Sequence, residues 1–417
     1  MSESNAPSGS TFSEKALPSV PPPPAISWHI PEVDGVRALA MLMIYVYHVW
    51  EFGDSPTKIL KMGGVSIDLF SPIGQFPSGV DLFMVLSGFC LFLPLCKSSE
   101  AVDRWNWKSY AIRRFRRIAP PYYAAIVYVT IMPFALTAFF HLLHKKANWQ
   151  PLPSVWQFAT HFTFTHTLFV STFGSICGAF WSLGLEAQFY AVFPVVVFGF
   201  RRYGLRFLFA MIGISVIYRV AVSILLPQIL SPEDTTQFDL RYFLPTVFFL
   251  GRWMQFAAGM LAAYAVAHHR KAGLTRNGRD GTIAILIALI FYLIAVMSNF
   301  SWSRWLPLRD LLLAASYMLL LMAVSISKTP LRRLFNNKLM VRLAFFSYSI
   351  FLLHQTTAYY FSELMKKILR LPGETRFYIL ITVGFLLVVG ISYVFFLIFE
   401  RPFLSNHLKR AEKIIAA

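Results

Sequence analysis

The chain has 417 residues, of which 56% are hydrophobic, 17% are aromatic and only 14% are charged. A composition this apolar excludes a soluble globular protein and indicates a polytopic membrane protein. The formal charge of +18 comes from cations clustered between apolar runs, which indicates membrane topology first and an anionic ligand second, rather than nucleic acid. Three scattered cysteines, Cys90, Cys96 and Cys177, predict neither a disulfide framework nor a metal site.

The chain divides into two short tails and one long apolar region. Residues 1–30 are polar and contain a run of prolines, which predicts a disordered cytosolic tail. Residues 31–403 hold about ten apolar runs of spanning length and predict an all-α, polytopic membrane bundle of about ten transmembrane helices. Residues 404–417 are expected to form a cytosolic C-terminal tail. The runs lie at about 34–52, 79–97, 118–143, 180–200, 204–226, 245–268, 281–298, 309–327, 341–361 and 377–399.

The distribution of Lys and Arg predicts the orientation of these spans. If the N-terminus is inside, the loops on the inner side collect most of the cations, as the positive-inside rule requires. We therefore expect a multi-pass protein of the plasma (inner) membrane with both termini in the cytosol.

The first span, Val33–Trp50, carries one cation near its start and one imidazole near its end. In a helix, Arg37 and His48 differ by about 1100° of rotation, so they point to the same side, and they are about 16 Å apart along the axis. The alternative is a structural role for both residues: Arg37 extends its side chain to the lipid head groups, and His48 makes a hydrogen bond in the core. Intramembrane ionisable residues are rare and usually mark a functional site.

Other spans place polar residues at a depth similar to that of His48. Helix rise puts them in the outer half of the membrane, where charges pair inside the bundle or line a wet cavity. The competing interpretation is a buried ion-pair network in which Glu186 neutralises Arg252. The residues are Asp81 in the second span, Glu186 in the fourth, Arg252 in the sixth and His354 in the ninth, with Ser347 and Tyr348 lower in the ninth.

Two connections between spans are also informative. Four arginines, Arg113, Arg114, Arg116 and Arg117, precede the third span, and Pro120 and Pro121 behind them are a helix-start signal. This cluster is denser than topology needs, and it suits a phosphorylated ligand or anionic lipid head groups. The long outer connection at 144–179 is aromatic without a clean span, so we expect a half-buried, surface-lying or re-entrant helix there. Its two histidines, His161 and His166, are interpreted as interfacial.

Seven motifs in order resemble those of acyltransferase family 3. They are Arg37 with His48, GVDLFMVLSGF, RRFRRIAPPYY, WSLGLEAQFY, RWMQFAAGM, SYSIFLLHQ and FERPF, and they extend over nearly all of the chain from about residue 31 to 403. The resemblance implies a ten-span enzyme that moves an acyl group, usually acetyl from acetyl-CoA, to a hydroxyl of an extracytoplasmic glycan or small molecule. By position, it implies that Arg37 and His48 are the Arg-and-His pair, that Arg114 and Arg117 are the paired arginines, and that Glu186 is the acidic motif residue.

This resemblance and the residues together suggest a mechanism. His48 is expected to act as general base on the acceptor hydroxyl, with Glu186 nearby to favour its charged form. Arg114, Arg117 and Arg37 are expected to bind the phosphates of acyl-CoA, the donor. Cys90 and Ser87 are weaker candidates for a covalent acyl carrier, because neither has a sequence neighbour that would activate it. The remaining cavity candidates are Asp81, Arg252, Ser347, Tyr348 and His354.

The expected partners are acyl-CoA, a carbohydrate or other hydroxyl acceptor, and the lipid bilayer. No nucleic acid and no metal are expected. The alternative is a transporter or proton-coupled channel without chemistry, in which the buried ionisable groups form a proton relay. That class predicts inverted repeats and broken helices, which the sequence does not show.

Overall fold

The computed structural model describes residues 28–62, 65–97, 105–146, 149, 151–229, 243–272, 277–297 and 306–404. The predicted tails at 1–30 and 404–417 therefore lie outside the described residues, except for residues 28–30 and 404.

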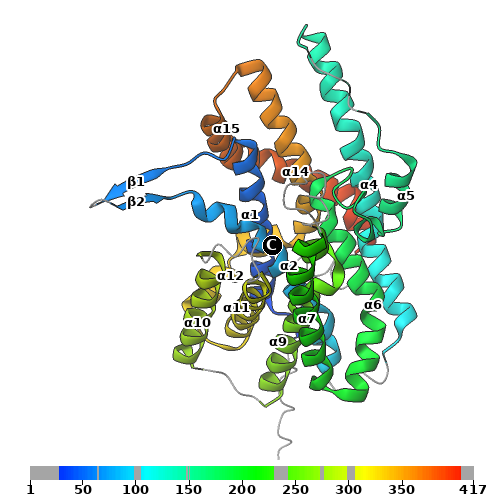
Figure 1. Ribbon diagram of the computed structural model, residues 1–417, viewed down its shortest axis with the longest axis vertical. Coiled ribbons are helices and arrows are strands. Elements are labelled where there is room, and N and C mark those ends of the chain that lie inside the picture. The colour runs from blue at the N-terminus through cyan, green and yellow to red at the C-terminus, as the bar shows by residue number, and fades with distance from the viewer. Residues whose placement is uncertain are drawn as a thin grey trace, which may run out of the picture.

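Helices account for nearly all of the described chain (Figure 1). The prediction of an all-α polytopic membrane bundle is confirmed. The helices are α1 (Pro31–Phe52), α2 (Gly79–Phe92), α4 (Trp107–Leu142), α5 (Val155–Phe162), α6 (Trp181–Tyr203), α7 (Leu205–Ile229), α9 (Trp253–Lys271), α10 (Gly278–Met297), α11 (Leu306–Ile326), α12 (Pro330–Phe335), α13 (Lys338–Phe345), α14 (Ser347–Leu364), α15 (Gly373–Ile379) and α16 (Phe385–Phe395).

One small β-hairpin projects from the bundle beside the end of α1 (Figure 1). Its strands β1 (Ile59–Met62) and β2 (Val65–Asp68) are antiparallel, with Ile59 opposite Asp68. This hairpin was not expected from the sequence.

Each of the ten predicted apolar runs lies on a helix or on a chain of joined helical segments. Within the described ranges, seven segments are long and apolar enough to cross a membrane by length and composition. Three long helices, α1, α9 and α14, lie outside this group, and half or more of the residues in each are buried. They form the interior of the bundle, whereas α7 and α10 present apolar side chains outward, as expected for contact with lipid.

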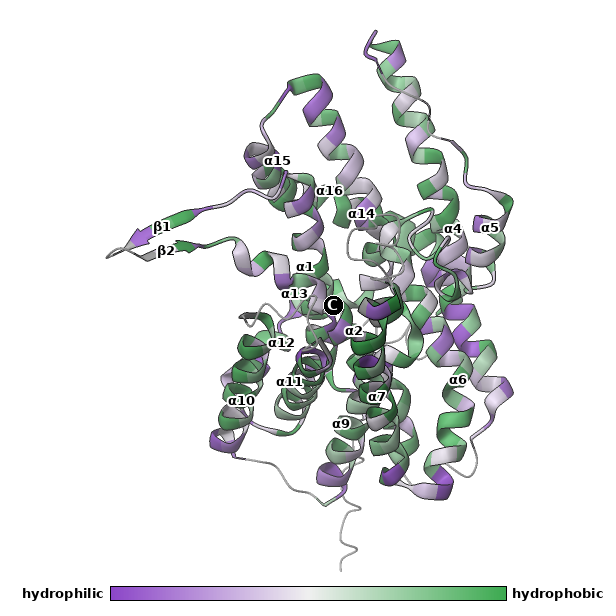
Figure 2. Cartoon of the chain, in the orientation of Figure 1, coloured by the Kyte–Doolittle hydropathy of each residue, from purple (hydrophilic) through white to green (hydrophobic). Residues whose placement is uncertain are grey.

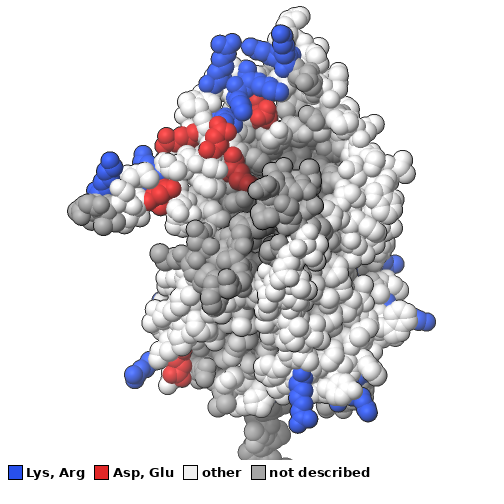
Figure 3. Space-filling model, viewed as in Figure 1, with Lys and Arg blue, Asp and Glu red and all other residues white. Residues whose placement is uncertain are grey.

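Hydropathy also varies along the length of the helices. Apolar residues occupy most of each long helix, and hydrophilic residues gather at the helix ends (Figure 2). On the face in Figure 3, Lys and Arg lie mainly toward the two ends of the long axis and on the projecting hairpin. This arrangement leaves an apolar band of the kind that a bilayer requires.

The start of α4 differs from the prediction. Pro120 and Pro121 were interpreted as a helix start, but α4 begins at Trp107 and contains both prolines. Asn106 caps this helix by accepting a hydrogen bond from the backbone N–H of Ser109 at 3.0 Å. The four arginines therefore lie on a helix, and their three-residue spacing decides which of them face inward.

Helices α2 and α9 cross in close contact because each presents a glycine to the other. A Cβ added at Gly88 would clash with the backbone carbonyl of Phe256, and one added at Gly259 would clash with that of Val85. Small residues allow membrane helices to approach this closely, which explains why glycines occur in the LSGF and FAAGM motifs.

We predict that Gly88→Ala destabilises the protein, because the added methyl group forces two backbones apart, at a cost of about 1–3 kcal/mol or more. Gly213→Ala on α7 is the matched control, since nothing lies within 4 Å of its added Cβ. Thermal unfolding in detergent measures the difference. Equal melting temperatures for the two variants would contradict this account of the α2–α9 contact.

Candidate active site

A cavity of about 270 Å³ lies inside the bundle. It is enclosed by α1, α2, α4, α6, α13 and α14, which come from distant parts of the chain. The structure brings six of the predicted site residues to this cavity: Arg37, Arg114, Arg117, Glu186, Ser347 and Tyr348.

The arginine cluster on α4 is split by helix periodicity. Arg114 and Arg117 are partly buried and line the cavity, whereas Arg113 and Arg116 are exposed. The guanidinium of Arg114 lies 5.3 Å from the ring centroid of Tyr190, which fixes it by a cation–π contact. Two cations thus face inward on the same side of one helix.

Arg37 adds a third cation from α1. Its Nη1 donates to Asp34 Oδ1 at 2.6 Å, and its Nη2 donates to Cys90 Sγ at 3.3 Å. The ring of His29 lies 2.9 Å from the other carboxylate oxygen of Asp34, and this hydrogen bond raises the pKa of His29. The sequence analysis did not single out His29 or Asp34, although Asp34 is three residues from Arg37, a spacing at which helical side chains meet.

Glu186 also faces this cavity. Its Oε1 accepts hydrogen bonds from Ser87 Oγ at 3.0 Å and from the hydroxyl of Tyr190. Tyr348 donates to the backbone carbonyl of Ile118 at 3.0 Å. These bonds connect α2 to α6 and α4 to α14 around the cavity. Tyr190 contacts both groups, since its hydroxyl binds Glu186 and its ring faces Arg114.

The two histidines lie beyond this cavity and are not among the residues that line it. The rings of His48 on α1 and His354 on α14 face each other with centroids 5.3 Å apart. His48 Nδ1 is 3.0 Å from Glu51 Oε2, and His354 Nδ1 is 2.7 Å from the carbonyl oxygen of Phe351. The carboxylate that binds His48 is thus Glu51, three residues along α1, whereas Glu186 binds Ser87 and Tyr190.

Glu51 is therefore a site residue that sequence reasoning missed, and its three-residue spacing from His48 was the available signal. With the proton on Nδ1 directed to Glu51, Nε2 of His48 carries a free lone pair. Nε2 of His354 is buried without a hydrogen-bond partner in the described part of the chain.

An aromatic pair lies between the cavity and the histidines. Phe351 lines the cavity, and its ring contacts His354 at a centroid distance of 5.5 Å. Phe83 from α2 also lines the cavity and meets Phe351 edge to face at 5.7 Å. These two rings form an apolar wall between the arginines and the histidine pair.

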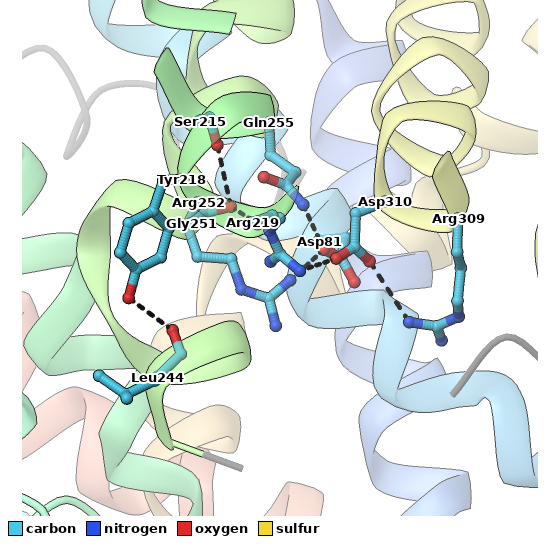
Figure 4. A network of polar contacts seen from close by, with 10 residues as sticks. All are labelled: Asp81, Ser215, Tyr218, Arg219, Leu244, Gly251, Arg252, Gln255, Arg309 and Asp310. Atoms are coloured by element: carbon cyan, nitrogen blue, oxygen red, sulfur yellow. Dashed lines mark hydrogen bonds and ion pairs between the residues drawn. The ribbon is translucent and has the colours of Figure 1, made fainter. Parts of the chain in front are cut away.

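Asp81 and Arg252, predicted as cavity residues, lie elsewhere. They pair with each other, and Gln255 Nε2 donates to the same oxygen of Asp81 at 2.8 Å (Figure 4). A second buried ion pair joins Arg219 of α7 to Asp310 of α11, and Arg219 Nε also donates to the carbonyl of Gly251 at 2.7 Å. Sequence reasoning missed Arg219 and Asp310, although a charge inside an apolar run was the signal.

The connection between α4 and α6 contains the short helix α5. Ser154 and Gln157 form a capping box at its start. His161 and His166 were interpreted as interfacial, but both are fully buried and stack with ring centroids 3.9 Å apart. Burial disfavours the imidazolium, which lowers the pKa of His161 to about 3 and that of His166 to about 4. Both are therefore neutral, and they are held by hydrogen bonds of His161 with the hydroxyl of Tyr122 and of His166 with the carbonyl of Phe180.

No group of three or more potential metal ligands occurs among the described residues. The fold and this site define a class: a multi-pass helical membrane protein with a cation-lined interior cavity and a histidine pair behind an aromatic wall. Residues 30–397 match the acyltransferase domain family, and the chain belongs to that family.

Known relatives share part of this domain. The chain is 29% identical over 228 residues to a Listeria monocytogenes protein named peptidoglycan O-acetyltransferase OatA, a match that covers 51% of this chain and 32% of that protein. It is 27% identical over 210 residues to a Staphylococcus aureus protein named as a candidate O-acetyltransferase, covering 45% of this chain and 28% of that protein. The chain is also 27% identical to the Bacillus subtilis protein YrhL, named as a candidate peptidoglycan O-acetyltransferase. That match covers 40% of this chain and 23% of that protein. The chain thus spans about a third or less of the length of these relatives, and no solved structure matches it.

We predict that Asp81→Ala lowers stability rather than the turnover of each folded molecule. Removing one partner of a buried ion pair leaves the other charge unpaired, at a cost of roughly 3–5 kcal/mol. Asp280→Ala on the exposed start of α10 is the control. Thermal unfolding and turnover per folded molecule are measured together. Normal stability with lost turnover would place Asp81 in the reaction site.

Proposed function

We propose that this protein is a membrane O-acetyltransferase that moves an acetyl group from cytosolic acetyl-CoA to a hydroxyl of an extracytoplasmic carbohydrate. The observation that carries the proposal is one cavity lined by three arginines, Arg37 of α1 with Arg114 and Arg117 of α4, and a histidine pair on α1 and α14 beyond it. Family membership supports acyl transfer over transport. The names of the relatives support a peptidoglycan-like acceptor.

The cavity suits the charged end of acyl-CoA. Arg37, Arg114 and Arg117 present guanidinium groups that bind phosphate by charge-assisted hydrogen bonds. Arg37 and His48 are eleven positions apart on α1, about 16 Å along the helix. An extended donor held by its phosphates at the arginines reaches toward His48, and its thioester then passes the wall formed by Phe83 and Phe351.

The chemistry then needs one general base. Nε2 of His48 accepts the proton of the acceptor hydroxyl as its oxygen attacks the thioester carbonyl carbon. The new C–O bond forms, the C–S bond breaks, and the proton passes from the imidazolium to the departing CoA sulfur. Glu51 holds the ring through Nδ1 and stabilises the imidazolium while it exists. No covalent acyl-enzyme is required.

Glu186 has a different role in this proposal from the one expected from the sequence, which was to favour the charged form of His48. It lies in the donor cavity with Ser87 and Tyr190, and Tyr190 carries the cation–π contact to Arg114. We propose that Glu186 positions Arg114 through Tyr190 and so shapes the donor site.

We predict that His48→Ala lowers transfer by about 10²–10⁴-fold, the usual contribution of a general base. Some loss of stability is also expected, because the ring contacts Phe52 and His354, so transfer is measured per folded molecule. His268→Ala at the exposed end of α9 is the control, and transfer to an acceptor glycan from radiolabelled acetyl-CoA is the measurement. Transfer within a few-fold of normal in His48→Ala would mean that the base is another group, with His354 the next to test.

We also predict that Arg114→Ala combined with Arg117→Ala raises the dissociation constant of CoA by at least ~100-fold, since each charge-assisted bond contributes about 1.5–3 kcal/mol. Arg113→Ala combined with Arg116→Ala is a matched control, because it removes the same charge from the exposed face of the same helix. Calorimetry on purified protein measures both. Equal weakening in the two double variants would point to a general charge effect and not to a phosphate site.

A further inference from the structure

A second cavity, of about 460 Å³, lies at the other end of α4 and α14. It is enclosed by the second half of α4, the segment 151–157 at the start of α5, and the last turns of α14. Neither the arginines nor the histidines line it. It is therefore separate from the donor cavity.

Its polar groups differ in kind from those of the first cavity. They comprise two phenols, a carboxylate, an amide, an ammonium and two hydroxyls: Tyr359, Tyr360, Glu363, Gln157, Lys367, Thr130 and Thr137. Lys367 Nζ lies 3.7 Å from the carboxylate of Glu363, so the one cation among the described lining residues is offset by an anion. The hydroxyl oxygen of Thr130 is buried without a hydrogen-bond partner in the described residues.

These groups match the chemistry of a neutral sugar. A pyranose offers an apolar C–H face, which packs on an aromatic ring, and a rim of hydroxyls that both donate and accept hydrogen bonds. Carboxylate, amide and hydroxyl side chains are the complementary partners. An anionic ligand would be disfavoured here because the single ammonium is already paired with Glu363.

The position of this cavity relates it to the histidine pair. Tyr359 contacts Phe52 edge to face at 5.4 Å, and Phe52 in turn stacks on His48 at 5.9 Å. On α14, Tyr359 is five positions beyond His354, or about 8 Å along the axis. The cavity is thus next to the histidines on the side opposite the arginines.

We propose that this second cavity binds the acceptor, as a neutral pyranose glycan, and holds one of its hydroxyls toward His48. The inference rests on the acyl-transfer function proposed above and adds where the acceptor binds. Tyr359 provides the stacking face, and Glu363 accepts hydrogen bonds from the sugar hydroxyls.

The test uses the full chain in lipid nanodiscs and a tetramer of β-1,4-linked N-acetylglucosamine as the probe. Saturation-transfer NMR and calorimetry measure binding of the probe to the unmodified protein, Tyr359→Ala and Glu363→Gln. Tyr378→Ala and Glu374→Gln on α15 are the matched controls, because Tyr378 is as exposed as Tyr359 (43% against 42%) and Glu374 lies on the surface. Calorimetry with CoA and hydrolysis of acetyl-CoA without acceptor report on the donor site.

We expect each cavity variant to weaken probe binding by about 10-fold or more, the effect of losing one hydrogen bond to a charged group or one stacking face. Their KM for the acceptor should rise while CoA binding and acetyl-CoA hydrolysis stay unchanged, and the controls should match the unmodified protein. Absence of probe binding at millimolar concentration, or equal binding in all variants, would overturn the proposal. Probe binding that the cavity variants weaken, without any acetyl-CoA turnover, would support the glycan site and instead refute the proposed acyl transfer.

Discussion

Pairing of buried charges between helices is the constraint on which this bundle depends. A charge in hydrocarbon must meet its partner inside the protein, because no water is available to it. Asp81 of α2 pairs with Arg252, the N-cap residue of α9, and Arg219 and Asp310 tie α7 to α11 (Figure 4). The close glycine contact between α2 and α9 brings the first pair within reach. Of these four helices, α2 also lines the donor cavity, together with α1, α4, α6, α13 and α14.

The polar residues of the membrane interior therefore have two different roles. Those of the α2–α7–α9–α11 network pair with one another, and none of them lines a cavity described above. Those around the donor cavity are held by partial pairing: Arg37 by Asp34, and Arg114 by the ring of Tyr190. A guanidinium fixed in this way keeps donors available for an anionic ligand, because a cation–π contact uses its face and leaves its N–H groups free.

The sequence predicted well what depends on one helix at a time. Each apolar run lies on helical segments, and Arg114 and Arg117, which the family resemblance paired, line the donor cavity while Arg113 and Arg116 are exposed. The same-side relation of Arg37 and His48 along α1 stays a prediction, since Arg37 lines the donor cavity and His48 does not. Partners between helices were not predictable in the same way. Asp81 and Glu186 were placed at similar depths, and depth alone does not determine which of them faces Arg252, because that depends on which helices are neighbours. Burial of His161 and His166 was not predicted for the same reason, since Tyr122 and Phe180, which contact them, come from other elements.

Helices α4 and α14 run past both cavities, and this gives the proposed reaction its geometry. Ser347 at the start of α14 lines the donor cavity, and Glu363 near its end lines the second one, sixteen positions or about 24 Å further along. That length is most of a bilayer core of ~30 Å. His354 lies between them, facing His48, with Phe83 and Phe351 on the donor side and Phe52 on the other. Under the proposed function, two substrates approach the base from opposite ends of the same helix. In this proposal only the acetyl group passes from the donor side to the acceptor side, so transfer across the membrane needs no alternating movement of the bundle.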